Sequence, residues 1–287
     1  MENRGKDTLK NDFLKIHKTI SHYDDWKSIV STQNNGKIMA PYIPFEGKKY
    51  NEYKIMLYGT AQNISWNYDY RNELINNSDK CMERLYYDKK FKKKYPLENI
   101  SYNQIGIGPY ACGILPALIG IFIFAKFGKK ISQINVIHDY ITMTNYYKYS
   151  LHTKTKDINP DKIDNTELKS KFKKEYLRIN DELVKKETCY FAPKYIISFN
   201  GRKNIVLSKN KNIELYVIND PAWIKRGGSK MFSTGGKWYK IAKKYNKDPI
   251  NELIDLYLKK IKNNEYEKLK DKIKIYLLFY YDQWKIK

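Results

Sequence analysis

The sequence predicts an α/β fold, with a central, mainly parallel sheet flanked by helices. Three short apolar runs, at 53–59, 195–199 and 213–218, have the length and the β-branched and aromatic content of strands, and the last two are expected to be buried. Each run ends at a glycine or an asparagine-containing turn, and charged or amphipathic stretches of helical length lie between the runs. Strands that alternate with helices are typical of a parallel sheet covered by helices on both faces.

The first 40 residues are predicted to form an N-terminal helical extension, since apolar residues recur there at roughly helical spacing before Pro41. Residues 41–287 are predicted to form the α/β domain, with a C-terminal helical segment. A further strand is expected to start at 134–137 and to lead toward Thr144 and Asn145. The charged stretch 153–187, which contains a predicted helix from about 166 to 186, is expected to form a solvated layer.

Two apolar stretches near the end of the chain are expected to pack in the core. Residues 250–261 carry an apolar stripe at helical spacing, and a second apolar run covers 273–281.

The segment from Ile105 to Ala125 carries no charge and is long enough to cross a bilayer. Its several glycines and prolines favour a buried helix that starts after Pro109 and is capped by Gly128. A membrane span is the alternative, and the buried helix is the simpler explanation, so no membrane partner is expected.

The charge balance indicates a polyanionic partner. Lysine and arginine total 54 against 31 acidic residues, which gives a net charge of +23, and DNA is the expected partner. Aromatic residues also interleave with lysines, as in 146–149, an arrangement that can stack bases and hold phosphates. The alternative is a lysine-rich composition that leaves a solvated basic surface without any ligand.

The cysteines and histidines exclude several kinds of site. Cys81, Cys112 and Cys189 are odd in number and widely separated, so neither a disulfide framework nor a CxxC metal site is expected. The four histidines show no metal-binding spacing, and neither a metal nor a cofactor is expected. The charged N-terminus has no signal-peptide pattern, so a cytoplasmic location is expected; the oligomeric state stays open.

Three polar loops each follow a predicted strand, at Gly59–Asn63, Thr144-Asn145 and Asn219-Asp220-Pro221. We expect them to converge on one crevice, because ligands of open α/β sheets bind at the carboxyl ends of the strands. Amides offer a donor and an acceptor to the edge of a heterocycle, and a carboxylate can orient water or stabilise an oxocarbenium ion.

The order of these loops resembles the uracil-DNA glycosylase superfamily over about residues 41 to 250. Residues 196–202 are similar to that fold's late core strand with its trailing glycine, and 219–228 to its His-Pro-Ser loop with a downstream Arg-Gly. Residues 57–63 resemble the water-activating loop, Thr144-Asn145-Tyr146 the element that supplies a base-reading asparagine, and 245–250 the terminal region.

The resemblance implies roles for individual residues. Asp220 stands at the histidine position and would position water or stabilise the sugar cation, with Asn63 or Gln62 assisting. Asn145 would contact the flipped base. The other residues expected to bind the base are Gly59, Thr60, Ala61 and Tyr146. Without the histidine, the implied target is a modified or non-standard base rather than uracil, and defence against base-modified phage DNA is one setting.

Ile224, Lys225 and Arg226 are expected to form a loop that wedges into the duplex and grips phosphate, with Lys230 as a further DNA contact. Plainer interpretations stay open for these positions: a surface turn for this loop, a turn-forming residue for Asp220, and an amide that satisfies backbone groups for Asn145.

Two other functions compete with base excision. Residues 218–223 resemble the Asp-Pro-Pro-Trp loop of DNA adenine methyltransferases, although Ala222 replaces the second proline. A non-catalytic, basic DNA-binding protein is the other alternative.

Overall fold

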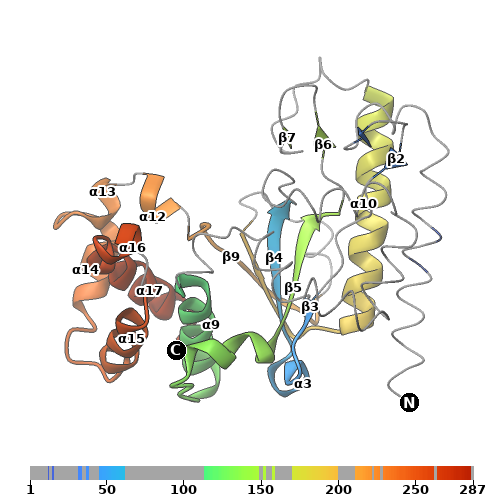
Figure 1. Cartoon of the computed structure of the whole chain (residues 1–287). Helices are drawn as coiled ribbons and strands as arrows, with labels where there is room; N and C mark the ends of the chain where they lie inside the picture. The colour runs from blue at the N-terminus through green and yellow to red at the C-terminus, as the bar shows by residue number, and fades with distance from the viewer. Residues whose placement is uncertain are drawn as a thin grey trace. The chain divides into compact units, whose positions relative to one another are not determined.

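The computed structural model describes a large part of the chain in two compact units, each discontinuous in sequence (Figure 1). The first unit draws on residues 1–46, 54–105 and 142–218, and the second on 47–53, 106–141 and 219–287. The described residues are 12, 15, 32–33, 37–38, 45–61, 113–148, 151–152, 157–158, 170–199, 211–221, 223–226, 229–261 and 264–285.

The first unit is built on a sheet with the strand order β3-β5-β4-β8-β9. Four of its strands run parallel, and Figure 1 shows β4 and β5 pointing the same way. They are β5 (Ile141–Tyr147), β4 (Ile55–Ala61), β8 (Tyr195–Ser198) and β9 (Glu214–Val217). The short β3 (Phe45–Glu46) pairs with β5 antiparallel at one edge. The predicted α/β class with a mainly parallel sheet is therefore confirmed.

Apolar side chains fix the register of the central strands. Ile55, Met56 and Leu57 of β4 lie opposite Tyr195, Ile196 and Ile197 of β8, and all except Tyr195, which is 5% exposed, are fully buried. A one-residue slip would turn each of these side chains to the other face of the sheet.

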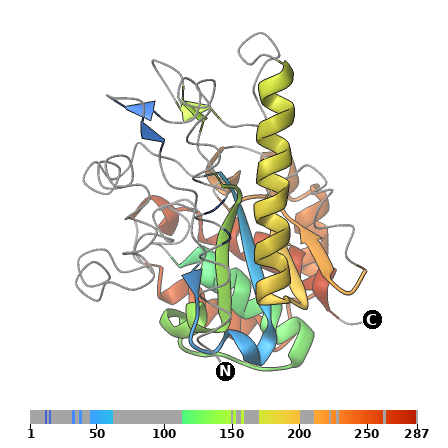
Figure 2. The same ribbon diagram turned by 90° about the vertical axis from the view of Figure 1, so that its right-hand side faces the viewer.

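One long helix, α10 (Ser170–Phe191), covers a face of this sheet (Figure 2). Its buried residues recur at helical spacing, as Tyr176, Ile179, Leu183 and Val184 show. The predicted helix is confirmed, but the expected solvated layer is wrong for this stretch, because one side of α10 is buried against strands. Two further strand pairs are β1 (Thr32–Gln33) with β2 (Lys37–Ile38), and β6 (Leu151–His152) with β7 (Asp157–Ile158).

The second unit is helical among its described residues. α9 (Ile114–Phe127) begins after Gly113 and ends at Gly128, and both glycines adopt the left-handed conformation (φ 85° and 64°). The Gly128 N–H donates to the Phe124 carbonyl at 2.9 Å, so the predicted C-cap is confirmed. The other elements are α3 (Tyr50–Tyr53), η2 (Ile134–Tyr140), α12 (Trp223–Arg226), α13 (Ser229–Phe232), α14 (Lys237–Lys243), α15 (Ile250–Lys259), α16 (Asn264–Glu267) and α17 (Lys270–Trp284).

Aromatic rings form much of the core of this unit. Phe122 of α9 packs edge-on against Trp284 of α17 at 5.0 Å between ring centroids. Trp238 of α14 stacks on Phe279 of α17 at 4.5 Å. The apolar stripe of α15 is buried as predicted, from Ile250 to Leu258. The C-terminal helix α17 is therefore central to the packing of the second unit.

Several expected element boundaries are wrong. Residues 134–137 begin a 3₁₀ helix instead of a strand, and the strand that follows, β5, contains Thr144 and Asn145. β4 likewise continues through Gly59 to Ala61, where a loop was expected. The 213–218 run forms an edge strand, β9, whose residues 214–217 are partly or largely exposed, and only Ile218 of this run is buried, so the expected buried strand is wrong.

In the first 40 residues, the structure describes helical positions at Asp12 and Lys15 and the β1–β2 pair. The last part of the expected helical extension is thus a strand pair. The structure describes the apolar segment 105–125 only from Gly113 on, and there it is the buried helix α9. Among the described residues, the structure has no helix with the length and apolar character needed to cross a membrane.

Candidate functional site

Asn145 is the expected site residue with the most unusual surroundings. It lies on β5, third from the carboxyl end of the strand, and its side chain is fully buried. Neither its Oδ1 nor its Nδ2 has a hydrogen-bond partner within the described part of the chain. Buried amide groups in proteins normally form hydrogen bonds, so a fully buried carboxamide with neither atom paired among the described residues is uncommon.

The neighbours of Asn145 on β5 show which face of the sheet it occupies. Thr144 Oγ1 donates to Glu187 Oε1 of α10 at 3.2 Å, and the Tyr146 hydroxyl donates to Asp181 Oδ1 of the same helix at 3.4 Å. Successive side chains of a strand point to opposite faces. Asn145 therefore points to the face opposite α10, whereas Tyr146, expected to bind the base, points toward α10.

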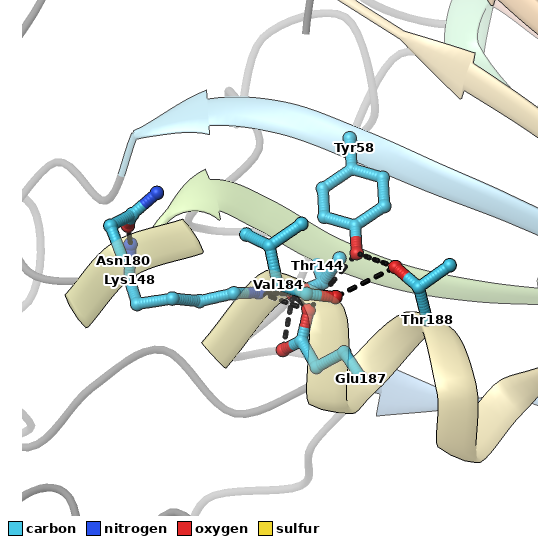
Figure 3. Close-up of polar contacts among 7 residues, drawn as sticks. All are labelled: Tyr58, Thr144, Lys148, Asn180, Val184, Glu187 and Thr188. Carbon is cyan, nitrogen blue, oxygen red and sulfur yellow. Dashed lines mark hydrogen bonds and ion pairs between the residues drawn. The ribbon is translucent and has the colours of Figure 1, made fainter. Parts of the chain in front are cut away.

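A buried polar network joins β4, the end of β5 and α10 (Figure 3). Lys148 Nζ forms an ion pair with Glu187 and donates to Thr144 Oγ1 at 2.5 Å. The Tyr58 hydroxyl donates to Glu187 Oε2 at 3.2 Å. Tyr58, Thr144, Lys148 and Glu187 all have 0% exposure. The Lys148 backbone N–H also donates to Asn180 Oδ1 of α10 at 2.8 Å, so the network ties the end of β5 to α10.

Burial dominates the titration of this network. It lowers the pKa of Lys148 to about 8, against the effect of its pairing with Glu187. Burial also raises the pKa of Glu187 to about 6, although Lys148, Thr144 and Tyr58 all favour the carboxylate. The pKa of Tyr58 is raised well above its usual value by burial and by the Glu187 charge, so Tyr58 remains a donor at neutral pH. Around pH 7 both Lys148 and Glu187 are charged.

Asp220 follows β9 and belongs to the second unit. It is half-buried, and the preceding residue, Asn219, is exposed. Two tyrosines of α17 hold the Asn219 backbone: its N–H donates to Tyr280 Oη at 2.8 Å, and the Tyr276 hydroxyl donates to its carbonyl at 2.6 Å. The backbone just before Asp220 is therefore held by side chains of α17, a helix that comes about 60 residues later in the sequence.

The other expected site residues have varied outcomes. Gln62 and Asn63 lie outside the described residues. Gly59, Thr60 and Ala61 are the last three residues of β4, and Gly59 is buried. Asn145 and Asp220 belong to different units, so the convergence of the three loops stays a prediction.

The segment expected to contact DNA needs one correction. Ile224, expected to wedge into the duplex, is 1% exposed and packs in the core of the second unit, because residues 223–226 form the short helix α12 instead of an open loop. Lys225 is exposed, with its Nζ 4.3 Å from the Tyr266 ring centroid. Lys230 is exposed as well, and Arg226 ends α12.

Tyr58, Glu187 and the tyrosines of α17 were not expected from the sequence. Lys148 was expected in a run, 146–149, that stacks bases and holds phosphates; that expectation is wrong for Lys148, which is fully buried and paired with Glu187. One signal was available for Lys148: it lies two residues from Tyr146 on an alternating strand, so it shares the face of Tyr146. No pattern identified Glu187, because α10 carries many charges, and among its described side chains only Glu187 is a buried charged one.

The described residues contain no group of three or more histidine, cysteine, aspartate or glutamate side chains that could hold a metal ion. Comparisons of the chain with protein-family models, curated proteins and solved structures found no match.

Proposed function

We propose that this protein is a DNA glycosylase that extrudes a modified or non-standard base and hydrolyses its N-glycosidic bond. The observation that carries the proposal is the Asn145 carboxamide, fully buried and without a partner among the described residues. Leaving a buried donor or acceptor unpaired costs about 1–3 kcal/mol. A ligand with an adjacent donor and acceptor would recover that cost, and the edge of a nucleobase offers such a pair.

The position of Asn145 supports a ligand-binding role. It lies near the carboxyl end of β5, which is flanked by β4 on one side and the short β3 on the other. Ligands of open α/β sheets bind at the carboxyl ends of the strands. The net charge of +23 favours a polyanionic substrate.

In the proposed reaction, the oxygen of water bonds to C1′ of the deoxyribose and the C1′–N bond breaks. The electron pair of that bond leaves with the base, and a proton from the water passes to the base or to solvent. Asp220 orients the water and stabilises the positive charge that develops on the sugar. Asn145 reads the extruded base, and the products are a free base and an abasic site.

The test is a panel of DNA oligonucleotides that carry natural, deaminated or modified bases, in single and double strands, without added metal. Alkali breaks the strand at each abasic site, so cleaved product reports excision. We expect product from at least one substrate and a much slower, still measurable, rate of product formation in Asp220→Ala. Salt-sensitive binding without product would favour a non-catalytic DNA-binding protein. Calorimetric binding of S-adenosylmethionine would favour a methyltransferase instead.

A further inference from the structure

Asn219 has both of its backbone polar groups bonded to side chains of one helix. Its N–H donates to Tyr280 Oη at 2.8 Å, and Tyr276 donates to its carbonyl oxygen at 2.6 Å. Tyr276 and Tyr280 are four residues apart on α17, so they lie on the same side of that helix. Together they hold one residue of the chain at two points.

The helix that carries these tyrosines is firmly packed. Tyr276 is 0% exposed and Tyr280 is 5% exposed. The Tyr280 ring stacks against Trp284 at 5.4 Å between centroids, and Trp238 lies 5.9 Å from Tyr276. Asn219 itself is exposed. Its backbone is therefore held by the two hydroxyls rather than by burial of its own side chain.

The chain is also constrained just after Asp220. Pro221 is buried, and its ring restricts its backbone φ angle. The Pro221 carbonyl accepts a hydrogen bond from the Ile224 N–H at 3.1 Å, at the start of α12. Asp220 thus lies between a residue held by two tyrosines and a buried proline.

Both tyrosine hydroxyls are neutral, and the charge of Asp220 acts on Tyr276. Burial, the neighbouring Tyr280 and the negative charge of Asp220 together raise the pKa of Tyr276 well above its usual value. Burial raises the pKa of Tyr280 to about 12, and the bond from the Asn219 N–H opposes that rise. Tyr276 therefore remains a hydrogen-bond donor across the physiological pH range.

We propose that Tyr276 and Tyr280 are positioning residues that hold Asp220 in place for base excision. This inference rests on the proposed function, in which Asp220 orients the attacking water. Catalysis is sensitive to such placement, because a displacement of about 1 Å can slow a reaction about 100-fold. The tyrosines touch neither water nor sugar in this account; they act only through the backbone at Asn219.

The test compares Tyr276→Phe, Tyr280→Phe and the double variant with Tyr257→Phe. Each change removes only a hydroxyl. Tyr257 is a matched control, because its ring is fully buried in the same unit and its hydroxyl donates to the Ile131 carbonyl at 2.6 Å. The measurements are the single-turnover excision rate on the base found in the panel, the Kd for the same DNA, and hydrogen exchange at the amides of Asn219 and Asp220.

We expect the double variant to excise about 100-fold more slowly, with a Kd within about twofold of wild type and faster exchange at the Asn219 amide. Tyr257→Phe should keep the wild-type rate. In an Asp220→Ala background, loss of both hydroxyls should change the remaining rate less than about twofold, because positioning residues act through Asp220.

An unchanged rate in the double variant would overturn the inference and leave the proposed function intact. An equal loss in Tyr257→Phe, or a full further loss in the Asp220→Ala background, would also overturn it. If wild-type protein yields no abasic product from any base, the proposed function fails, and the inference fails with it.

Discussion

Lys148 and Glu187 form an ion pair in which neither side chain has any exposed surface. Lys148 directly follows β5, and Glu187 lies on α10. The pair therefore joins the carboxyl end of the strand that carries Asn145 to the helix that covers the other face of the sheet. This buried ion pair holds the end of β5, and on the opposite face of that strand Asn145 has no hydrogen-bond partner among the described residues.

Breaking this pair from one side should be costly. Lys148→Met leaves a buried carboxylate without its cation, and Glu187→Leu leaves a buried ammonium without its anion. We expect either change to lower the free energy of unfolding by about 3–5 kcal/mol. The double variant should be destabilised less than either single variant, because it leaves no unpaired charge. Urea denaturation at pH 7 measures all three.

The matched control is an exposed pair on the same helix, in which Arg178 Nη2 lies 2.7 Å from Glu175 Oε1. Glu175→Gln should cost no more than about 1 kcal/mol, because water screens exposed charges. A cost for Lys148→Met as small as that of Glu175→Gln would contradict the network seen in Figure 3.

The shifted pKa values of the pair predict an unusual dependence of stability on pH. Glu187 titrates at about 6 in the folded protein against 4.5 for the ordinary side chain, so its contribution to stability is present below pH 4.5 and is lost as the pH rises through 6. Lys148 titrates at about 8 against 10.5, so its contribution is present above pH 10.5 and is lost as the pH falls through 8.

The free energy of unfolding of wild type, relative to the Lys148→Met/Glu187→Leu variant, should thus be lowest between pH 6 and 8. It should fall by about 2 kcal/mol from pH 4.5 to 6 and rise again above pH 8. Urea midpoints across this range give the difference. A difference that does not vary with pH would show that burial does not dominate the titration of these groups.

Gly120 of α9 packs directly against Tyr257 of α15. A Cβ at this position would lie 2.8 Å from Tyr257 Cζ and 2.9 Å from Ile137 Cδ1. In an open helix, alanine is favoured over glycine by about 1 kcal/mol. Here Gly120→Ala should destabilise by about 1–3 kcal/mol because it overpacks the core.

Thermal or urea denaturation tests this change against Gly235→Ala, which has open space around its Cβ position. The control should change stability by less than about 0.5 kcal/mol. If Gly120→Ala proved stabilising, α9 and α15 would have to pack less closely than the structure shows.

Lys225 and Lys230 are the exposed lysines expected to contact phosphate. Lys225→Gln and Lys230→Gln should each weaken DNA binding to a similar degree for all sequences. Each should also reduce the slope of log Kd against log salt concentration by about 1, because one fewer counterion is released. Fluorescence anisotropy with a labelled duplex gives both quantities.

The matched charge change is Lys185→Gln, at an exposed position on α10. If it reduced the salt slope as much as the other two, binding would depend on net charge alone, and Lys225 and Lys230 would have no specific role.

The strands and helices with strong apolar patterns could be predicted from the sequence. The runs at 53–59 and 195–199 gave β4 and β8, and the spacing of apolar residues in 250–261 gave α15. These patterns can be recognised because buried positions recur along the chain with the period of a strand or a helix. The fold class followed from their alternation with helices.

The failures have a common physical reason, which is that tertiary contacts decided the outcome. The apolar residues of 134–137 favoured a strand, but there η2 packs Ile137 into the core and leaves Asn135 exposed. Ile224 was expected in an exposed wedge, whereas α12 turns it inward. The hydroxyl bonds of Tyr276 and Tyr280 join residues about 60 apart in sequence, and no local pattern identifies such a pair.

Asn145 was selected from its resemblance to a base-reading asparagine, and the structure adds the absence of any partner for its amide among the described residues. Whether Asn145 reads the extruded base is best measured by excision with Asn145 variants on the substrate panel, with abasic sites counted after alkali. Wild type should yield product, and Asn145→Ala should fold normally yet lose at least tenfold in rate, because the base loses its paired contacts. Asn145→Asp should change which bases are accepted, because a carboxylate only accepts hydrogen bonds, whereas the amide also donates. Equal rates and equal base preference in all three proteins would show that Asn145 does not read the base.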